Sequence, residues 1–300
     1  MYVDVAVVPV AGLGTRLLPL TRSVPKELLP LGCKPVLQHV FDELRSAGIR
    51  HIVLVTGAGE DSIKQHFQID PNLEQQLLTK GKFDQLSQLK SLTTDVQIYY
   101  VRQSQQLGLG HAVWCAREVI GDRPFTIALG DAMFGLNSSS LCERLQRVFK
   151  NTSADAVIAF QEVPKDKVSR YGVAEIGATD IDNEGSFEVS NLIEKPAVAD
   201  APSQYAIAAR YVCQSRIFDL LGNTKEGVGG EIQLTDALRS LILAGGKVVG
   251  VPLRNNEKRF DVGNFDSYFS AFVEVACADP IHGDSLKRQL QAIIDKDQAR

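Results

Sequence analysis

The sequence predicts an α/β fold in which a mixed, mostly parallel central sheet carries helices on both faces, with an added β-hairpin region and a C-terminal helical tail. Short apolar runs alternate along the chain with segments of helical periodicity, which is typical of strand–helix–strand units. The runs are almost continuously apolar, as expected for strands buried on both faces of a parallel sheet. One later segment alternates apolar and polar residues around a turn, which indicates the hairpin.

The predicted order starts with a buried strand. Val3–Val10 contains four valines before Pro9, which suits a strand covered on both faces. Apolar residues then recur at helical spacing over residues 36–47, and Gly48 ends this helix. Further strands and helices are expected in this order: strands at Ile52–Val55 and Val96–Val101, a helix at His111–Ile120, strands at Phe125–Leu129 and Ala156–Phe160, a helix at Leu234–Ala244, and a strand at Lys247–Val251.

Two segments interrupt this alternation. Pro71–Thr94 is rich in Gln, Leu and Lys and is expected to form a helical insertion. Tyr171–Lys195 alternates around the polar turn Asp182–Gly185, which predicts an antiparallel hairpin added to the sheet. We therefore expect one Rossmann-like α/β domain over residues 1–264, with the insertion at about 71–94, followed by a C-terminal helical segment over residues 265–300.

Composition and charge exclude several classes of protein. Hydrophobic residues make up 44% and charged residues 23% of the 300 residues, which excludes collagen-like and disordered chains. The net charge of −4 argues against a nucleic-acid partner, because such proteins carry a basic face. No stretch approaches the ~20 apolar residues of a membrane span, and Met1–Val10 lacks the basic leader of a signal peptide, so we expect no membrane partner.

The five cysteines bear on the cellular compartment. They are scattered, odd in number and without Cys-x-x-Cys or paired Cys/His spacing, which argues against a disulfide framework and against a zinc site. A protein of the reducing cytoplasm fits this pattern best. The five positions are Cys33, Cys115, Cys142, Cys213 and Cys277.

The segment Pro9–Pro35 is expected to form a long loop stiffened by prolines. Gly12 and Gly14 follow the first strand, and glycine backbone N–H groups can cradle phosphate oxygens, although a tight turn is the simpler explanation of a lone Gly-x-Gly. Leu17 stands where a dinucleotide fingerprint has its third glycine, and the Gly-Lys-Ser/Thr of a Walker A loop is absent. A long helix in this segment is prevented by four prolines: Pro19, Pro25, Pro30 and Pro35.

Charged residues give this loop and one later strand end a possible chemistry. Arg16 and Lys26, beside the backbone donors, could neutralise a polyphosphate, whereas basic residues alone favour a solvated basic loop. Asp131 follows the strand Phe125–Leu129, and the carboxyl end of a parallel strand is where such sheets bind ligands. Since Mg²⁺ prefers carboxylate and phosphate oxygens, Asp131 is a candidate metal ligand, with a capping aspartate in a turn as the alternative.

These residues resemble a known family. The segment AGLGTRLLPLTRSVPKELLPLGCKP is similar to the signature loop of sugar-nucleotide pyrophosphorylases, and it looks like that of the bacterial UTP–glucose-1-phosphate uridylyltransferases. The resemblance continues in order over seven further segments: VRQ (101–103), GLGHAV (108–113), YGVAEI (171–176), IEKP (193–196), RYV (210–212), EIQLTDAL (231–238) and DVGN (261–264).

The resemblance implies a reaction. A phosphate oxygen of α-D-glucose 1-phosphate attacks the α-phosphorus of UTP in line, with help from Mg²⁺, and UDP-glucose and pyrophosphate form. The nucleotide half is then about residues 1–135 and the sugar-binding half about residues 136–264, in a homo-oligomer (a dimer or tetramer). Two alternatives stay open: the same chemistry with dTTP or another sugar 1-phosphate, and a catalytically silent homologue that binds nucleotide sugars.

The resemblance also implies roles for single residues. The expected catalytic set is Arg16, Lys26, Asp131 and Lys195, and the expected metal ligands are Asp131 and Asp261. Nucleotide contacts are expected from Ala11, Gly12, Gly14, Thr15, Glu27, Gln103 and Gly108. Sugar contacts are expected from Gly172, Glu194, Lys195 and Glu231. His111, in the shared GLGHAV segment, is expected to be a local hydrogen-bonding residue and not a catalytic base.

Three positions depart from the family pattern. Gly130 stands where a proline precedes the metal aspartate, Ala209 where a glycine precedes RYV, and Gly230 where an aspartate precedes EIQLTD. We expect Gly130 to loosen the loop before Asp131, Ala209 to add a methyl group near the sugar, and Gly230 to remove a carboxylate there. These changes bear on sugar selectivity and leave the expected catalytic residues intact.

Overall fold

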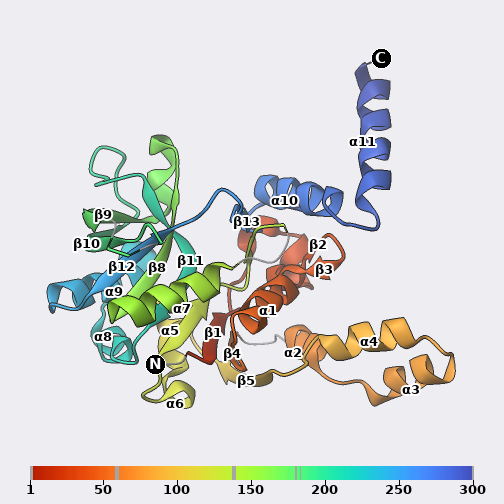
Figure 1. The fold of residues 1–300 in the computed structure, drawn as a ribbon, viewed down its shortest axis with the longest axis horizontal. Coiled ribbons are helices and arrows are strands. Elements are labelled where there is room, and N and C mark those ends of the chain that lie inside the picture. The colour runs from red at the N-terminus through yellow and green to blue at the C-terminus, as the bar shows by residue number, and fades with distance from the viewer. Residues whose placement is uncertain (1–2, 58–60, 137–139, 180, 183, 299–300) are drawn as a thin grey trace.

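The structure, a computed structural model, describes residues 3–57, 61–136, 140–179, 181–182 and 184–298. One nine-stranded sheet runs through the molecule in the order β5-β4-β1-β6-β11-β8-β12-β10-β9, with helices on both faces (Figure 1). The predicted mixed α/β fold is therefore confirmed. The strands are β1 Val5–Pro9, β4 His51–Thr56, β5 Gln97–Arg102, β6 Phe125–Ala128, β8 Ala156–Glu162, β9 Gly172–Thr179, β10 Phe187–Glu194, β11 Tyr205–Cys213 and β12 Val248–Pro252.

Parallel and antiparallel pairing divide this sheet. β5, β4, β1 and β6 pair in parallel, as do β8 and β12. β11 lies antiparallel between β6 and β8, and the β9–β10 hairpin adds antiparallel strands at the far edge. The alternation of strands and helices predicts a mostly parallel sheet, but antiparallel pairs are more frequent among the described strands than this prediction implies. One reason is that β11 lies between the two parallel parts of the sheet and runs antiparallel to both of its neighbours.

The strand predicted at Val96–Val101 is present as β5, but the expectation that it is buried is wrong. β5 forms one edge of the sheet, and Tyr99 and Tyr100 are 38% and 39% exposed. Only Ile98 and Val101 of β5 are partly covered. An edge strand has a neighbouring strand on one side only, so fewer residues surround its apolar side chains than surround those of a central strand.

Side chains of β1 alternate between two hydrophobic cores, one on each face of the sheet. Ala6 and Val8 pack under α1, α2 and α7, whereas Val5 and Val7 pack under α5, α6, α8 and α9. The predicted helix at His111–Ile120 is divided at Ala116 into α5 and α6. These helices are α1 Val36–Ser46, α2 Asp61–Phe67, α5 Leu109–Cys115, α6 Arg117–Ile120, α7 Leu141–Thr152, α8 Ile217–Asn223 and α9 Leu234–Leu243.

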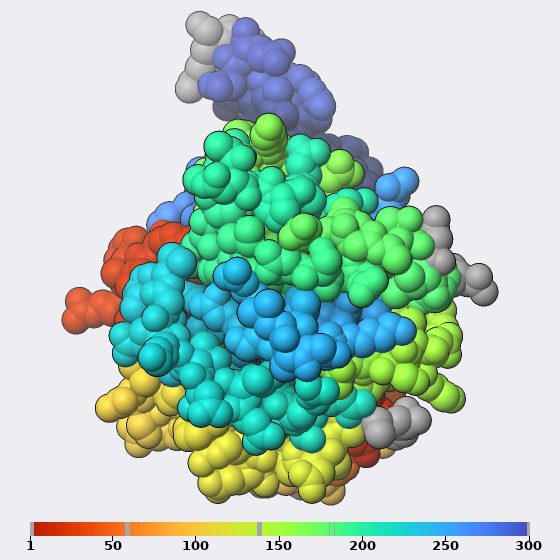
Figure 2. All heavy atoms as spheres, turned by 90° about the vertical axis from the view of Figure 1, so that its left-hand side faces the viewer, coloured from red at the N-terminus to blue at the C-terminus, as the bar shows by residue number. Residues whose placement is uncertain are grey.

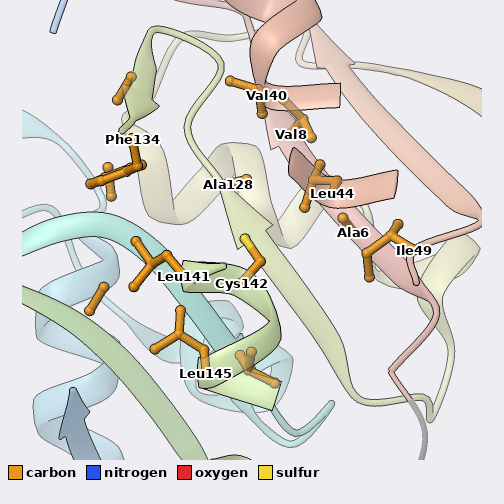
Figure 3. Packing of buried hydrophobic residues seen from close by; sticks show 14 of the residues in the cluster. Ala6, Val8, Val40, Leu44, Ile49, Ala128, Phe134, Leu141, Cys142 and Leu145 are labelled. Atoms are coloured by element: carbon orange, nitrogen blue, oxygen red, sulfur yellow. The ribbon is translucent and has the colours of Figure 1, made fainter. Parts of the chain in front are cut away.

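The core under α1 and α7 is shown in Figure 3. Val40 and Leu44 of α1 lie beside β1, and Leu141 and Leu145 project from α7 into the same cluster. The members of each pair are four residues apart, which places them on one face of their helix. This packing fixes β1, and with it the start of the loop that follows, against the centre of the sheet.

A third hydrophobic cluster anchors that loop. Leu17, Leu29 and Leu31 are buried against α10 (Phe265–Cys277) and against a two-stranded ribbon of β7 (Ala132–Phe134) and β13 (Arg259–Asp261). The loop contains no α-helix, as its prolines predict. It consists of the 3₁₀ turns η1 Thr15–Leu17, η2 Leu20–Arg22 and η3 Lys26–Leu28, followed by β2 Pro30–Leu31 and β3 Lys34–Pro35.

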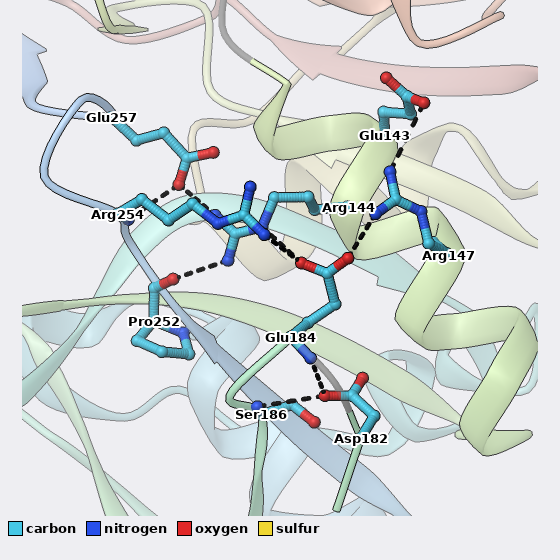
Figure 4. Close-up of polar contacts among 9 residues, drawn as sticks. All are labelled: Glu143, Arg144, Arg147, Asp182, Glu184, Ser186, Pro252, Arg254 and Glu257. Carbon is cyan, nitrogen blue, oxygen red and sulfur yellow. Dashed lines mark hydrogen bonds and ion pairs between the residues drawn. The ribbon is translucent and has the colours of Figure 1, made fainter. Parts of the chain in front are cut away.

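A polar network joins the predicted hairpin, now β9–β10, to α7. Arg144 of α7 is 1% exposed and pairs with Glu257 and with Glu184 of the hairpin turn. Arg147 and Arg254 reach Glu184 as well, so that three arginines surround one carboxylate (Figure 4). Two further 3₁₀ segments are η4 (Lys165–Arg170) and η5 (Val228–Gly230). Residue 183 of the predicted turn lies outside the described residues.

Two helical segments stand clear of the sheet. The insertion forms α3 (Pro71–Thr79) and α4 (Phe83–Ser91), and the tail ends in α11 (Gly283–Gln298), as their composition predicts. Figures 1 and 2 both show α11 projecting from the body of the molecule. Gly283 is the one buried residue of α11. In the part of the chain that the structure describes, every helix is too short or too polar to traverse a bilayer.

Candidate active site

A cleft of about 680 Å³ opens where β5, β1 and β6 end, at their carboxyl termini. Open parallel sheets bind their ligands at this position. The cleft brings together twelve of the residues that the sequence singles out: Ala11, Gly12, Gly14, Thr15, Arg16, Lys26, Glu27, Gln103, Gly108, Asp131, Glu231 and Asp261.

Glycine and a buried leucine shape the loop after β1. Gly14 has a φ of +59°, a left-handed conformation that glycine adopts without strain, and its carbonyl accepts the Thr21 hydroxyl at 2.8 Å. Leu17 is fully buried beneath the loop, whereas Thr15 and Arg16 on the same turn are exposed at the cleft. The loop is therefore held from behind and presents its polar residues to a ligand.

Lys26 lies at the acidic centre of the cleft. Its Nζ is 2.5 Å from Asp131 Oδ2 and 3.9 Å from Glu27 Oε1. Burial lowers the pKa of Lys26, but the carboxylates of Asp131, Glu27 and Asp261 outweigh burial and raise the pKa above its ordinary value. Burial raises the pKa of Asp131, yet Lys26 and Arg259 together lower it below its ordinary value. Both partners are therefore charged near neutral pH.

Asp131 and Asp261 are joined through the β7–β13 ribbon. β7 follows Asp131 directly, and the ribbon pairs Asp261 with Ala132. The backbone N–H of Val262 donates to the backbone oxygen of Asp131 at 3.2 Å. Both carboxylates line the cleft and offer the oxygen atoms that Mg²⁺ prefers. The ammonium group of Lys26 in contact with Asp131 shows that this position stabilises a cation, so the donor set fits the predicted metal.

The other end of the cleft is built around Gln103, which is 4% exposed. Its Nε2 donates to the backbone oxygen of Gly108 at 3.1 Å and lies 3.0 Å from His111 Nδ1. The donor group of this amide is thus already engaged, which leaves its carbonyl oxygen for a ligand. Gly108 has a φ of +97°, and a Cβ there would lie 2.7 Å from the Glu231 Cβ, so this position requires glycine.

Gln106 is a cleft residue that the sequence reasoning missed. Its Nε2 donates to the backbone oxygen of Ala11 at 2.8 Å and so joins the segment after β5 to the loop after β1. Ala11 is expected to contact the nucleotide, and this bond engages its backbone oxygen. A glutamine in the polar run Ser104–Gln106 carries no signal that separates it from a solvated loop residue.

The far wall contains three more residues that were not predicted, Arg170, Tyr171 and Arg259. Arg259 donates to Asp261 Oδ1 at 3.0 Å, and its guanidinium group lies 5.8 Å from the centre of the Tyr171 ring. One signal could have found Arg259. In a strand, residues two apart share a face, so Arg259 belongs on the same side as Asp261.

Gly172, Glu194 and Lys195 form a sugar-side group outside the lining of the cleft. The hairpin register places Glu194 opposite Gly172, and the Lys195 N–H donates to the Tyr171 backbone oxygen at 2.9 Å. Lys195 Nζ is 3.3 Å from Glu194 Oε1, and Glu194 Oε2 accepts the Thr235 hydroxyl at 2.7 Å. The group adjoins the cleft at Tyr171, and its contact with a substrate stays a prediction.

Comparison with known proteins identifies the family. Residues 5–277 of this 300-residue chain match the family model described as nucleotidyl transferase. The chain belongs to the nucleotidyl transferase family. Its membership confirms the resemblance that the signature loop indicates.

Individual relatives extend over nearly the whole chain. This nucleotidyl transferase is 38% identical over 295 residues to a UTP–glucose-1-phosphate uridylyltransferase of Bacillus subtilis (strain 168), with 98% of each chain covered. It superposes on the UTP-bound UGPase from Acinetobacter baumannii with a TM-score of 0.87 and 35% identity, covering 97% of this chain and 99% of that one. A UDP-glucose pyrophosphorylase complexed with UDP-glucose gives a TM-score of 0.80 and 30% identity, covering 90% and 97%.

The structure corrects two of the expectations about departures from the family pattern. Gly130 does not loosen its loop, because it is buried and a Cβ there would lie 2.7 Å from Val10 Cγ1 and 3.3 Å from Glu27 Cγ. Ala209 has a φ of +57°, and its methyl group packs in the core under α1 and α7 instead of reaching the sugar-side group.

One group of possible metal ligands lies outside the cleft within the described residues: Cys33, Asp279 and His282, whose ligand atoms are within 4.8 Å of one another. The Asp279 carboxylate accepts the Ile281 and His282 N–H groups at 2.9 and 2.7 Å and the Cys33 thiol at 3.6 Å. These contacts hold the turn between α10 and α11 against the turn between β2 and β3.

Proposed function

We propose that this nucleotidyl transferase transfers a uridylyl group from UTP to α-D-glucose 1-phosphate, giving UDP-glucose and pyrophosphate. The observation that carries the proposal is the convergence of Arg16, Lys26, Asp131 and Asp261 on one cleft that also contains Gln103. The UTP-bound and UDP-glucose-bound relatives support this choice of substrates.

The chemistry requires alignment and charge stabilisation more than covalent catalysis. An oxygen of the sugar phosphate forms a bond to the α-phosphorus of UTP, the bond from that phosphorus to the bridging oxygen breaks, and pyrophosphate leaves with the electron pair. Arg16 and Lys26 stabilise the negative charge that develops on the leaving group. Lys195 is assigned to the sugar phosphate and Glu194 to sugar hydroxyls, because they adjoin the cleft at Tyr171.

Mg²⁺ is the proposed metal, held by Asp131 and Asp261. When bound, it supplies positive charge against the phosphate oxygens. With Mg²⁺ bound there in place of its ammonium group as the partner of Asp131, Lys26, whose Nζ also lies near Gly12, would then contact the phosphates.

Pyrophosphate release, measured for UTP, dTTP, CTP and ATP against several sugar 1-phosphates, tests the proposal. We expect the highest kcat/KM with UTP and glucose 1-phosphate, and a loss of about 100-fold or more in Lys26→Met. Lys34→Met is the matched control, because Lys34 lies on the same loop but pairs with Asp42 and is outside the cleft lining. Absence of turnover with every pair, together with binding of UDP-glucose, would identify a silent homologue.

We also infer a homo-oligomer in the cytoplasm. The support for assembly is the exposed apolar surface of the projecting segments, including Ile293 and Ile294 on α11 and Phe83 on α4. The support for a reducing compartment is that all five cysteines are free.

A further inference from the structure

We propose that His111 is a positioning residue that holds the Gln103 amide in one orientation, with its carbonyl oxygen presented to the base, so that the cleft selects a base bearing an N–H at that edge. This inference rests on the proposed function, because it states what fixes base choice at the same site. His111 lies outside the cleft lining and acts through Gln103.

The orientation of the amide follows from its two partners. The backbone oxygen of Gly108 can only accept, so the group 3.1 Å from it is the NH₂ of Gln103. The same Nε2 lies 3.0 Å from His111 Nδ1, so its second hydrogen is available to Nδ1, which must then accept. Both donor positions are used inside the protein, and the carbonyl oxygen is the polar atom that remains.

His111 is itself held in place. It sits on α5, whose first turn is fixed by the Gly110 N–H donating to the Ile232 oxygen at 2.8 Å. The ring stacks at 26° on Trp114 and has the Cys115 Sγ 3.9 Å from Nε2. Burial lowers the pKa of His111, with a hydrogen bond to the Gln105 backbone opposing it, so the neutral ring is favoured. The contact with the Gln103 NH₂ then requires that Nδ1 carries no hydrogen. Cys115 is the titratable side chain that faces the ring.

The consequence for base choice is direct. Uracil and thymine carry an N–H at ring position 3, which the carbonyl oxygen of Gln103 can accept. Cytosine has an acceptor nitrogen there, so two lone pairs would face each other and both groups would lose their hydrogen bonds. Without His111, one of the two contacts that oppose rotation of the amide is lost, and the rotated amide can donate to cytosine.

Two isosteric variants separate this role from simple packing. His111→Asn can place an accepting oxygen near the position of Nδ1. His111→Leu introduces a side chain of the same shape as asparagine but without an acceptor. We expect the ratio of kcat/KM for UTP to that for CTP to fall about tenfold in His111→Leu and to stay within about twofold of the wild-type ratio in His111→Asn. An unchanged ratio in a folded His111→Leu protein would overturn the proposal.

A pH profile gives a second test that does not depend on the folding of the leucine variant. Protonation of His111 would place a donor against a donor, so the KM for UTP of the wild type should rise as the pH falls below the ordinary histidine value of 6.5. In His111→Asn the imidazole is absent while UTP titrates as before, so the rise in KM at low pH should be smaller. Identical profiles for the two proteins would contradict the inference.

Nucleotide binding without the sugar distinguishes the inference from the proposed reaction. Titration calorimetry with UTP and CTP measures base selectivity directly. Selective binding of UTP that depends on His111, without turnover of glucose 1-phosphate, would reject the reaction and support the inference. Full turnover with unchanged selectivity in His111→Leu would reject the inference and leave the reaction intact.

Discussion

The pair formed by Lys26 and Asp131 shows how one contact sets the charge of a site. The lowered pKa of Asp131 means that the stability it contributes is present above the pKa of an unfolded aspartate and is lost as the pH falls through the folded value. The raised pKa of Lys26 means that its contribution is present below the pKa of an unfolded lysine and is lost only as the pH rises through the folded value. The pair is therefore intact across the neutral range.

Replacing one carboxylate tests the metal assignment. We expect Asp131→Asn to lower Mg²⁺-dependent turnover by about 100-fold or more while the circular dichroism spectrum stays unchanged, because the amide keeps the shape and loses the charge that a cation needs. The control is Asp284→Asn on α11, an aspartate that is 86% exposed and outside the cleft. Wild-type activity in Asp131→Asn would remove this residue from the metal site.

The space around Gly130 gives a prediction for stability. A methyl group there would lie 2.7 Å from Val10 Cγ1, so Gly130→Ala should cost about 1–3 kcal/mol in the free energy of urea unfolding. In a Val10→Ala background the added cost should be smaller by about 1 kcal/mol, since the clashing methyl group is gone. A Val8→Ala background, two residues earlier in β1, should leave the cost unchanged, and equal relief in both backgrounds would contradict this account.

At the level of strands and helices, the pattern of apolar residues predicted those elements whose apolar side chains are in fact buried. β1, β6 and α1 agree with prediction because the sheet buries both faces of the strands and one face of the helix. β5 departs because an edge position depends on strand order, which no local pattern contains. The antiparallel entry of β11 has the same cause.

A buried ion pair links β11 to α1 and gives the second stability prediction. Arg210 is fully buried, with its Nη2 2.8 Å from Glu43 Oε2 and further hydrogen bonds donated to the Leu129 and Ala132 backbone oxygens. Arg210→Met leaves the Glu43 charge buried without its partner and should cost about 3–5 kcal/mol in urea unfolding. Arg216→Met, which removes a 46% exposed arginine paired with Asp155, should cost about 0–1 kcal/mol. Similar losses in the two variants would show that burial does not decide the cost.

For the whole molecule, the sequence predicted those site residues that lie in recognisable motifs and not those that lie outside them. The signature loop, Asp131 and Asp261 lie in recognisable segments, and the structure brings them into one cleft. Gln106 and Arg170 could not be found, because their place in the wall depends on how distant segments fold together. Lys195 shows a different limit. The IEKP motif identifies this residue and the structure places it beside the cleft, but neither shows which part of a substrate it contacts.

The projecting helix α11 carries the prediction for assembly. Leu286, Leu290, Ile293 and Ile294 fall on one side of this helix, and the last two are 64% and 49% exposed. Ile293→Gln with Ile294→Gln should reduce the mass from light scattering toward that of one 32.8 kDa chain. Arg288→Gln with Asp295→Gln, on the opposite side, should leave the mass unchanged. A wild-type protein that is already a single chain would contradict the proposed oligomer.

The short β7–β13 ribbon has a consequence for how the enzyme can move. Its ladder and the bond from Val262 to Asp131 tie the two acids to one small piece of structure, and the leucines beneath the loop of Arg16 and Lys26 pack against the same ribbon. A displacement of the ribbon would therefore carry the acids and the base of that loop together. Acids and cations would shift as one unit when a ligand binds, and their mutual spacing would be preserved.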